Sequence, residues 1–286
     1  MQIRTDLALE QKEMHRNLPK GISSEEVKVG DALITKITVK NEQGAKALGK
    51  PIGIYTTIEV PPFSDNLRDD ELIKTVADEL YTLLPKKGDV LVVGLGNRNI
   101  TPDALGPKAA EGILATRHIS DEIRRVAGIE DIRTVSVIAP GVLGQTGIEV
   151  FNLLRGIVDE IKPTCVIAID ALASRYLKRL GCTVQMCDSG IEPGAGVGNA
   201  RHEISEKTLG VKVIAVGVPT VTDAATLVYD LTGKNFDGAK PDGRQMIITP
   251  REVDLLITRA AGLIADAVNK ALHPTTEQNI ITELLA

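Results

Sequence analysis

Two aspartates of the chain each follow a short apolar run. Asp103 comes shortly after the run 91–95, and Asp170 directly follows the run 165–169. Such runs predict buried strands of a parallel sheet, so both carboxylates should lie at the carboxyl edge of that sheet, where open α/β sheets place their active sites. Two aspartates held close together cannot both ionise at low cost, so one keeps a proton while the other accepts one from water. This pair predicts hydrolysis that needs no metal.

A structural role competes with catalysis at Asp103. It follows Thr101 and Pro102 at the expected start of a helix, where an acid can cap the first turn. The spacing is consistent with both roles. Asp170 is harder to explain structurally, because an acid directly after five apolar strand residues is costly unless it faces a cleft or a hydrogen-bond partner.

The elements that must position these acids alternate along the chain. Apolar periodicity predicts helices over 69–84, 103–116, 147–161, 220–231 and 249–272, and strands over 32–39, 52–60, 91–95, 134–138, 165–170, 183–187 and 211–218. Strands that alternate with helices indicate βαβ units. We therefore predict an α/β fold with a mostly parallel twisted sheet, helices on both faces and a small N-terminal β element formed by the first two strands. The polar residues 1–30 are expected to be a tail or pro-segment rather than core.

Composition narrows the class of protein. The 286 residues suit one large α/β domain, and 33 Lys plus Arg against 38 Asp plus Glu give a net charge of −5. With no basic run, three Phe, four Tyr and no Trp, direct nucleic-acid binding is not expected. The three cysteines lack metal-site spacing, which is typical of a reduced interior. No apolar signal segment or membrane-spanning window is present, so we expect a cytoplasmic protein with no membrane contact.

Glycine-rich turns follow several predicted strands, at 94–97, 140–144, 189–198 and 217–220. Together they could line a cleft with backbone amides, whereas any single glycine could simply let the chain leave a strand with positive φ. The residues that several other kinds of chemistry require are absent from the sequence. Asn99 takes the place of the third glycine of a dinucleotide fingerprint, and Glu206 takes the place of the second histidine of a zinc protease motif that would begin at His202. Walker A and Gly-x-Ser-x-Gly sequences are absent.

Several longer blocks have a more specific pattern. They are 94–97, Thr101–Lys108, Pro140–Val142, Ile169–Ala173, Asp188–Ile191, 196–199 and 217–220. Through these blocks nearly the whole chain resembles the spore germination protease family. Its members are endopeptidases of endospore-forming bacteria that degrade small acid-soluble spore proteins when germination starts.

The resemblance implies a phosphorylase/hydrolase-like α/β fold, a self-processing zymogen and a homotetramer in the cytoplasm of the forespore or spore core. It also implies that Asp103 and Asp170 are the catalytic pair. We expect no cofactor, although a metal role stays open. In the related hydrogenase maturation endopeptidases the corresponding acidic positions bind metal. A metal-dependent maturation-type peptidase with Asp103 and Asp170 as ligands is therefore an alternative, and a non-enzymatic binding protein that uses the glycine-rich cleft is a third.

The amino terminus contains a second resemblance to this family. Substrates and processing sites of the family resemble Thr-acid-apolar-Ala-x-Glu, and residues 5–10 read Thr-Asp-Leu-Ala-Leu-Glu. Self-cleavage is then expected between Asp6 and Leu7. Residues 1–6 would be the propeptide and residues 7–286 a single α/β peptidase domain.

Four further charged residues are secondary candidates for substrate binding. Arg175 and Arg201 could bind the acidic residue of the cleavage motif, although arginines on helices are usually solvated. Asp188 and Asp223 could position substrate, although local turn or cap hydrogen bonds are the common role for such residues.

Overall fold

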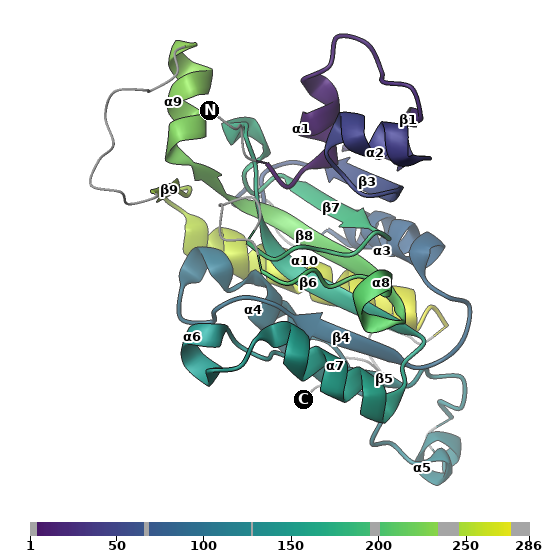
Figure 1. Ribbon diagram of the computed structural model, residues 1–286. Coiled ribbons are helices and arrows are strands. Elements are labelled where there is room, and N and C mark those ends of the chain that lie inside the picture. Colours follow the sequence, from purple (N-terminus) through teal and green to yellow (C-terminus); the bar gives the residue numbers. More distant parts are fainter. Residues whose placement is uncertain (1–4, 66–68, 127, 195–200, 234–245, 276–286) are drawn as a thin grey trace.

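The apolar runs of the chain pair into one sheet (Figure 1). The computed structural model describes residues 5–65, 69–126, 128–194, 201–233 and 246–275. Within them the strands are β1 (Ile22–Val29), β2 (Ala32–Val39), β3 (Gly53–Glu59), β4 (Val90–Gly94), β5 (Val135–Ile138), β6 (Cys165–Ala173), β7 (Thr183–Cys187), β8 (Lys212–Asp223) and β9 (Ile247–Ile248). Their order in space is β1-β2-β3-β7-β8-β6-β4-β5, with β9 beside β8.

The sheet has a parallel half and an antiparallel half. Strands β8, β6, β4 and β5 pair in parallel, whereas β1, β2, β3, β7 and β8 pair antiparallel. The predicted α/β class is confirmed, and the parallel pairing that we expected holds for the half that contains both aspartate-bearing segments. The predicted N-terminal β element is not separate, because β3 pairs with β7 and so joins it to the main sheet.

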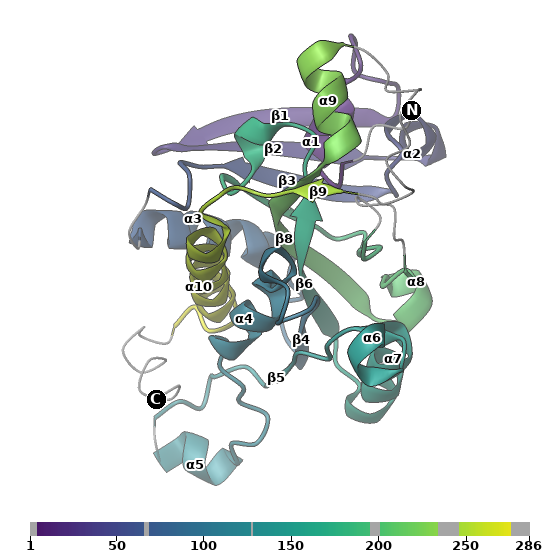
Figure 2. The same cartoon turned by 90° about the vertical axis from the view of Figure 1, so that its left-hand side faces the viewer.

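Helices cover both faces of the sheet, as predicted (Figure 2). One face packs against α3 (Asp70–Leu83), α4 (Leu105–Glu111) and α10 (Val253–Leu272), and the other against α7 (Val150–Ile161) and α8 (Glu206–Leu209). In β4 the alternate residues Val90 and Val92 face the first layer, while Leu91 and Val93 face the second. Burial on both faces explains why the parallel strands are continuous apolar runs.

The remaining helices lie at the ends and edges of the sheet. They are α1 (Ala8–Glu13), α2 (Glu42–Leu48), α5 (Asp121–Val126), α6 (Leu143–Thr146) and α9 (Ala224–Thr232), together with the short 3₁₀ turns η1 (Thr101–Asp103) and η2 (Leu177–Arg179). In the part of the chain that is described, none of the helices has the length and apolar character required to cross a membrane.

The prediction that residues 1–30 lie outside the core is wrong for residues 7–9. Leu7 and Ala8 are completely buried, Leu9 is nearly so, and α1 packs in a core cluster with residues of β2, β3 and α2. Strand β1 is the exposed edge of the sheet. An edge strand buries few side chains, so its sequence is polar and gave no core signal.

Near the two aspartates, the bounds of one helix and one strand differ from the predicted bounds. The helix predicted over 103–116 is divided into η1 and the shorter α4. Strand β6 does not end at Asp170 but continues to Ala173 beside β8. Because β4 ends at Gly94, opposite Ile169, the last four residues of β6 extend beyond their neighbour β4. This extension forms part of the site described below.

Candidate active site

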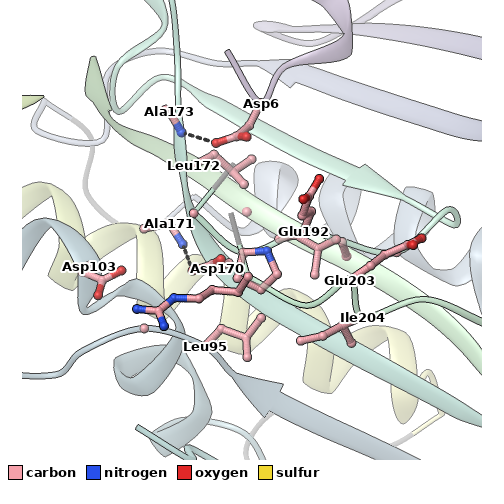
Figure 3. Close-up of a pocket in the computed structure, with 18 of the residues that line it drawn as sticks. Asp6, Leu95, Asp103, Asp170, Ala171, Leu172, Ala173, Glu192, Glu203 and Ile204 are labelled. Carbon is pink, nitrogen blue, oxygen red and sulfur yellow. Dashed lines mark hydrogen bonds between the residues drawn. The ribbon is translucent and has the colours of Figure 1, made fainter. Parts of the chain in front are cut away.

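A cavity of about 1050 Å³ lies at the carboxyl ends of β4 and β6. Its walls include Asp103 and Asp170, the end of β6, residues of β7, and Thr5 and Asp6 from the amino terminus. Glycines of all four predicted turns also line it, while residues 195–200 of the third turn lie outside the described residues. In Figure 3, Asp103 is drawn to the left of Asp170, and Asp6 is drawn above it beside Ala173. The fold therefore brings the two predicted catalytic carboxylates to one cavity.

Asp103 is positioned by the loop that follows β4. Its Oδ2 accepts a hydrogen bond from the backbone N–H of Asn97 at 2.8 Å. The hydroxyl of Thr220 on β8 donates to the carbonyl of Pro102 at 2.7 Å and fixes η1 against the sheet. Gly96 has a φ of +112°, and a Cβ at this position would lie 2.1 Å from the carbonyl oxygen of Asp103. Any larger residue at position 96 would displace the loop that carries this acid.

Asp170 occupies a strand position in the centre of the sheet. It pairs in parallel with Gly217 of β8, and it is only 6% exposed. Its Oδ1 accepts a hydrogen bond from the N–H of Ala171 at 2.8 Å. A carboxyl group in this position is buried at high cost if it is ionised, which favours its protonated form.

The pKa values of both acids are raised, that of Asp170 more than that of Asp103. Burial, followed by the nearby charges of Asp103 and Asp6, raises the pKa of Asp170 well above its usual range. Burial also raises the pKa of Asp103, and the hydrogen bond from Asn97 opposes this shift. Both shifts favour the protonated form of the acids, and the effect is stronger at Asp170 than at Asp103.

The amino-terminal segment enters the cavity at the extension of β6. The backbone N–H of Asp6 donates to the carbonyl of Ala173 at 2.9 Å, and Asp6 Oδ2 accepts from the N–H of Ala173 at 2.8 Å (Figure 3). The carbonyl oxygen of Asp6 accepts from Lys50 Nζ at 2.9 Å and from Gln185 Nε2 at 3.0 Å. Both the backbone and the side chain of Asp6 are therefore held in place.

Glu10, the last residue of the cleavage-like motif, is fully buried. Its carboxylate accepts hydrogen bonds from the backbone N–H groups of Arg175 and Tyr176, at 2.7 and 3.0 Å, and from the hydroxyl of Thr5. The guanidinium of Arg179 lies 3.4 Å away. These donors fix α1, and with it the position of Asp6 and Leu7 relative to β6.

The four secondary candidates have other contacts. Arg175 forms a bidentate pair with Asp230 of α9, and Arg201 pairs with Glu149 at 3.5 Å. Asp188 accepts from the N–H of Ile54 at 2.7 Å, and Asp223 caps α9. Of these four side chains, only Arg201 belongs to the described lining of the cavity.

Comparison with known proteins decides the family. A model of the family described as Germination protease matches residues 2–234. The chain belongs to the germination protease family. The predicted resemblance is therefore confirmed, and so is the prediction of an endopeptidase.

Relatives within the germination protease family match over almost their full length. The chain is 42% identical to the germination protease of Caldanaerobacter subterraneus subsp. tengcongensis, over 99% of this chain and 98% of that protein. It is 41% identical to the germination protease of Clostridium tetani over 100% of both chains, and 34% identical to that of Bacillus licheniformis over 97% and 95%. Among solved structures, the [NiFe] hydrogenase maturation protease HycI from Thermococcus kodakarensis matches 66% of this chain with a TM-score of 0.38 and 17% identity.

The described residues of this germination protease homologue include no cluster of three metal-ligating side chains. Asp103 and Asp170 share the cavity, but within the described ranges no three His, Cys, Asp or Glu side chains converge as ligands. A catalytic zinc ion usually has three protein ligands, so Asp103 and Asp170 by themselves do not form such a site.

The sequence analysis did not predict Lys50 and Gln185. Lys50 lies in the short turn between α2 and β3, where a lysine carries no signal. Gln185 carries a weak one, because it is a polar residue in the middle of the buried strand β7. A buried amide requires hydrogen-bond partners, and its partners here come from residues 6 and 8.

Proposed function

We propose that this protein is an aspartate-dependent endopeptidase that begins the degradation of small acid-soluble spore proteins at germination. It is made as a zymogen in the forespore, acts in the spore core as a homotetramer, and processes itself by cutting the Asp6–Leu7 bond. Asp103 and Asp170 activate the water that attacks the peptide. The membership of the germination protease family supports the substrate class and the compartment.

One observation supports the self-processing step more than any other. Residues 5–10 carry a cleavage-like sequence, and Asp6 lies in the same cavity as Asp103 and Asp170, close enough for its charge to raise the pKa of Asp170. That Asp6 shares one cavity with the proposed catalytic pair supports self-processing at the Asp6–Leu7 bond. The same position excludes another substrate from this part of the cavity until residues 1–6 have left.

The protonation states suggest a division of roles. Asp103, hydrogen-bonded to the N–H of Asn97, is the base that accepts a proton from the attacking water. Asp170 is buried and keeps its proton, so it is the acid that donates to the leaving nitrogen of Leu7. The two acids exchange these roles before the next turnover, so one proton shared by the pair is sufficient.

The test compares Asp103→Asn and Asp170→Asn with the wild-type chain. Each variant should lower the rate of cleavage of a purified small acid-soluble spore protein, and of self-processing, by about 10²- to 10⁴-fold, because each removes one proton-transfer step. Mass spectrometry measures both cleavages, and circular dichroism verifies the fold. The control is Asp188→Asn, which alters an acid that does not line the cavity and leaves an oxygen to accept from Ile54.

Three outcomes would contradict this proposal. Wild-type turnover by either variant would remove that aspartate from the mechanism. Loss of wild-type activity in a chelator, restored by added metal, would favour the metal-dependent alternative. Spore protein that stays intact after long incubation with the processed chain would favour a binding protein.

A further inference from the structure

The carbonyl group of Asp6 has a more polar environment than its place in the chain requires. Its oxygen accepts from Lys50 Nζ at 2.9 Å and from Gln185 Nε2 at 3.0 Å, so an ammonium and an amide converge on one backbone oxygen. The two donors come from segments far apart in sequence, the turn after α2 and the strand β7. One hydrogen bond would satisfy a backbone carbonyl, and here it receives two, one of them from a cation.

The orientation of Gln185 is fixed by a second contact. Its Oε1 accepts from the N–H of Ala8 at 2.7 Å, and the side chain is buried in β7. The amide thus bridges the peptide groups on the two sides of Leu7. With the N–H and Oδ2 of Asp6 bonded to Ala173, the Asp6 carbonyl is held by contacts on several sides.

We propose that Lys50 and Gln185 are catalytic residues that stabilise the oxyanion formed on the Asp6 carbonyl oxygen during cleavage of the Asp6–Leu7 bond. This inference rests on the proposed function, which makes that carbonyl the electrophile. Preorganised donors at a carbonyl oxygen are worth more in the tetrahedral intermediate than in the ground state, because charge develops on that oxygen.

The reaction can be written with every atom assigned. The oxygen of water bonds to the Asp6 carbonyl carbon, a proton of the water passes to Asp103, and the π electrons move onto the oxygen held by Lys50 and Gln185. When the intermediate collapses, the carbonyl reforms, the carbon–nitrogen bond to Leu7 breaks, and Asp170 protonates the nitrogen. The products are a new carboxyl group on Asp6 and a new amino group on Leu7. A substrate bound in the same register would place its own scissile carbonyl between the same two donors.

The experiment follows self-processing of the full-length chain. Lys50→Met and Gln185→Met should each lower the first-order rate of loss of residues 1–6 by about 10²- to 10³-fold, as expected for removal of one oxyanion donor. Lys50→Arg should recover part of the loss because it restores a cation. The matched control is Lys46→Met, which alters an exposed lysine one helical turn earlier in α2 and should process at the wild-type rate.

A second measurement separates chemistry from docking of the segment. Hydrogen exchange of the backbone amides of Leu7 and Gln11, which donate to Thr5 and Leu7 and not to Gln185, should be as slow in Lys50→Met and Gln185→Met as in the uncleaved Asp170→Asn chain. Exchange that rises in proportion to the loss of rate would mean that the two residues only hold the segment, and would overturn the inference.

The results also distinguish this inference from the proposal on which it depends. If Lys50→Met and Gln185→Met process within about twofold of the wild-type rate while Asp170→Asn is inactive, the oxyanion role is wrong and the aspartate mechanism stands. If the wild-type chain does not cut between Asp6 and Leu7 at all, both are wrong.

Discussion

At the scale of single residues, the proposed function depends most on one buried carboxyl group. Asp170 lies in a central strand between apolar neighbours, almost without exposure to solvent. Its position raises its pKa through burial, and Asp103 and Asp6 add to the shift. When the fold raises the pKa of an acid, that acid destabilises the folded state at every pH at which it is ionised in the unfolded chain.

A pH-dependent stability difference follows at Asp170. The unfolded aspartate ionises above about pH 3.8, whereas the folded one keeps its proton to higher pH, so its unfavourable contribution grows as the pH rises from that value. Asp170→Asn removes the contribution. We expect the variant to have a Tm a few degrees above wild type at pH 7, about the effect of 1 kcal/mol in a chain of this size, and no difference near pH 3.5. Thermal melts across this pH range test the prediction, and a Tm below wild type at pH 7 would contradict it.

At the scale of elements, a cluster of charges fixes α1 over the antiparallel half of the sheet. Arg179 of η2 is 2% exposed and contacts Glu10, Glu13 and Glu59, at 3.4, 2.6 and 3.1 Å. Glu10 itself is fully buried. The contacts link the start of the chain to residues 169 positions later, so α1 is held by tertiary structure rather than by its own short sequence.

Removal of the arginine should therefore release α1. Arg179→Met leaves Glu10 buried without its cation, and we expect a loss of about 3 kcal/mol in the free energy of unfolding. Urea unfolding measures the loss, and Lys178→Met, at an exposed position on the same turn, should cost less than about 1 kcal/mol. If the two variants were equally stable, α1 would not depend on this charge cluster.

At the scale of the whole molecule, the chain places Thr5 and Asp6 in its own cavity. Asp6 contacts Ala173, Lys50 and Gln185 of the same chain, and Leu7 and Ala8 are buried beside them. Cleavage after Asp6 would free residues 1–6 and leave α1 attached through Glu10. The residues that remain would form one wall of the processed site.

This arrangement predicts that self-processing occurs within one chain. The rate constant for loss of residues 1–6 should not change over a hundredfold range of protein concentration, because the scissile bond already lies in the cavity of its own chain. A full-length Asp170→Asn chain mixed with processed wild-type protein should stay uncut on the same timescale. A rate that rises in proportion to concentration, or cutting of the variant by wild type, would show that chains process one another.

The sequence by itself determined the features that depend on local pattern. Continuous apolar runs predicted β4, β6, β7 and β8 because parallel and central strands are buried on both faces. Apolar residues at helical spacing predicted α3 and α10, because these helices bury apolar residues at that spacing. The position of Asp103 and Asp170 after such runs predicted that both would lie at one edge of the sheet, and the family motifs agreed.

Only the tertiary structure decided what surrounds the two aspartates. The polar residues 5–10 gave no core signal, yet they are buried because Ala173, Arg175 and Arg179 supply their partners from far along the chain. Lys50 and Gln185 meet at one carbonyl through contacts that span 44 and 179 positions. Periodicity reports which face of an element is apolar, but it carries no information about which distant polar groups will satisfy one another. For that reason the sequence could locate the proposed catalytic pair, whereas the groups that hold residues 5–10 in place appeared only in the folded chain.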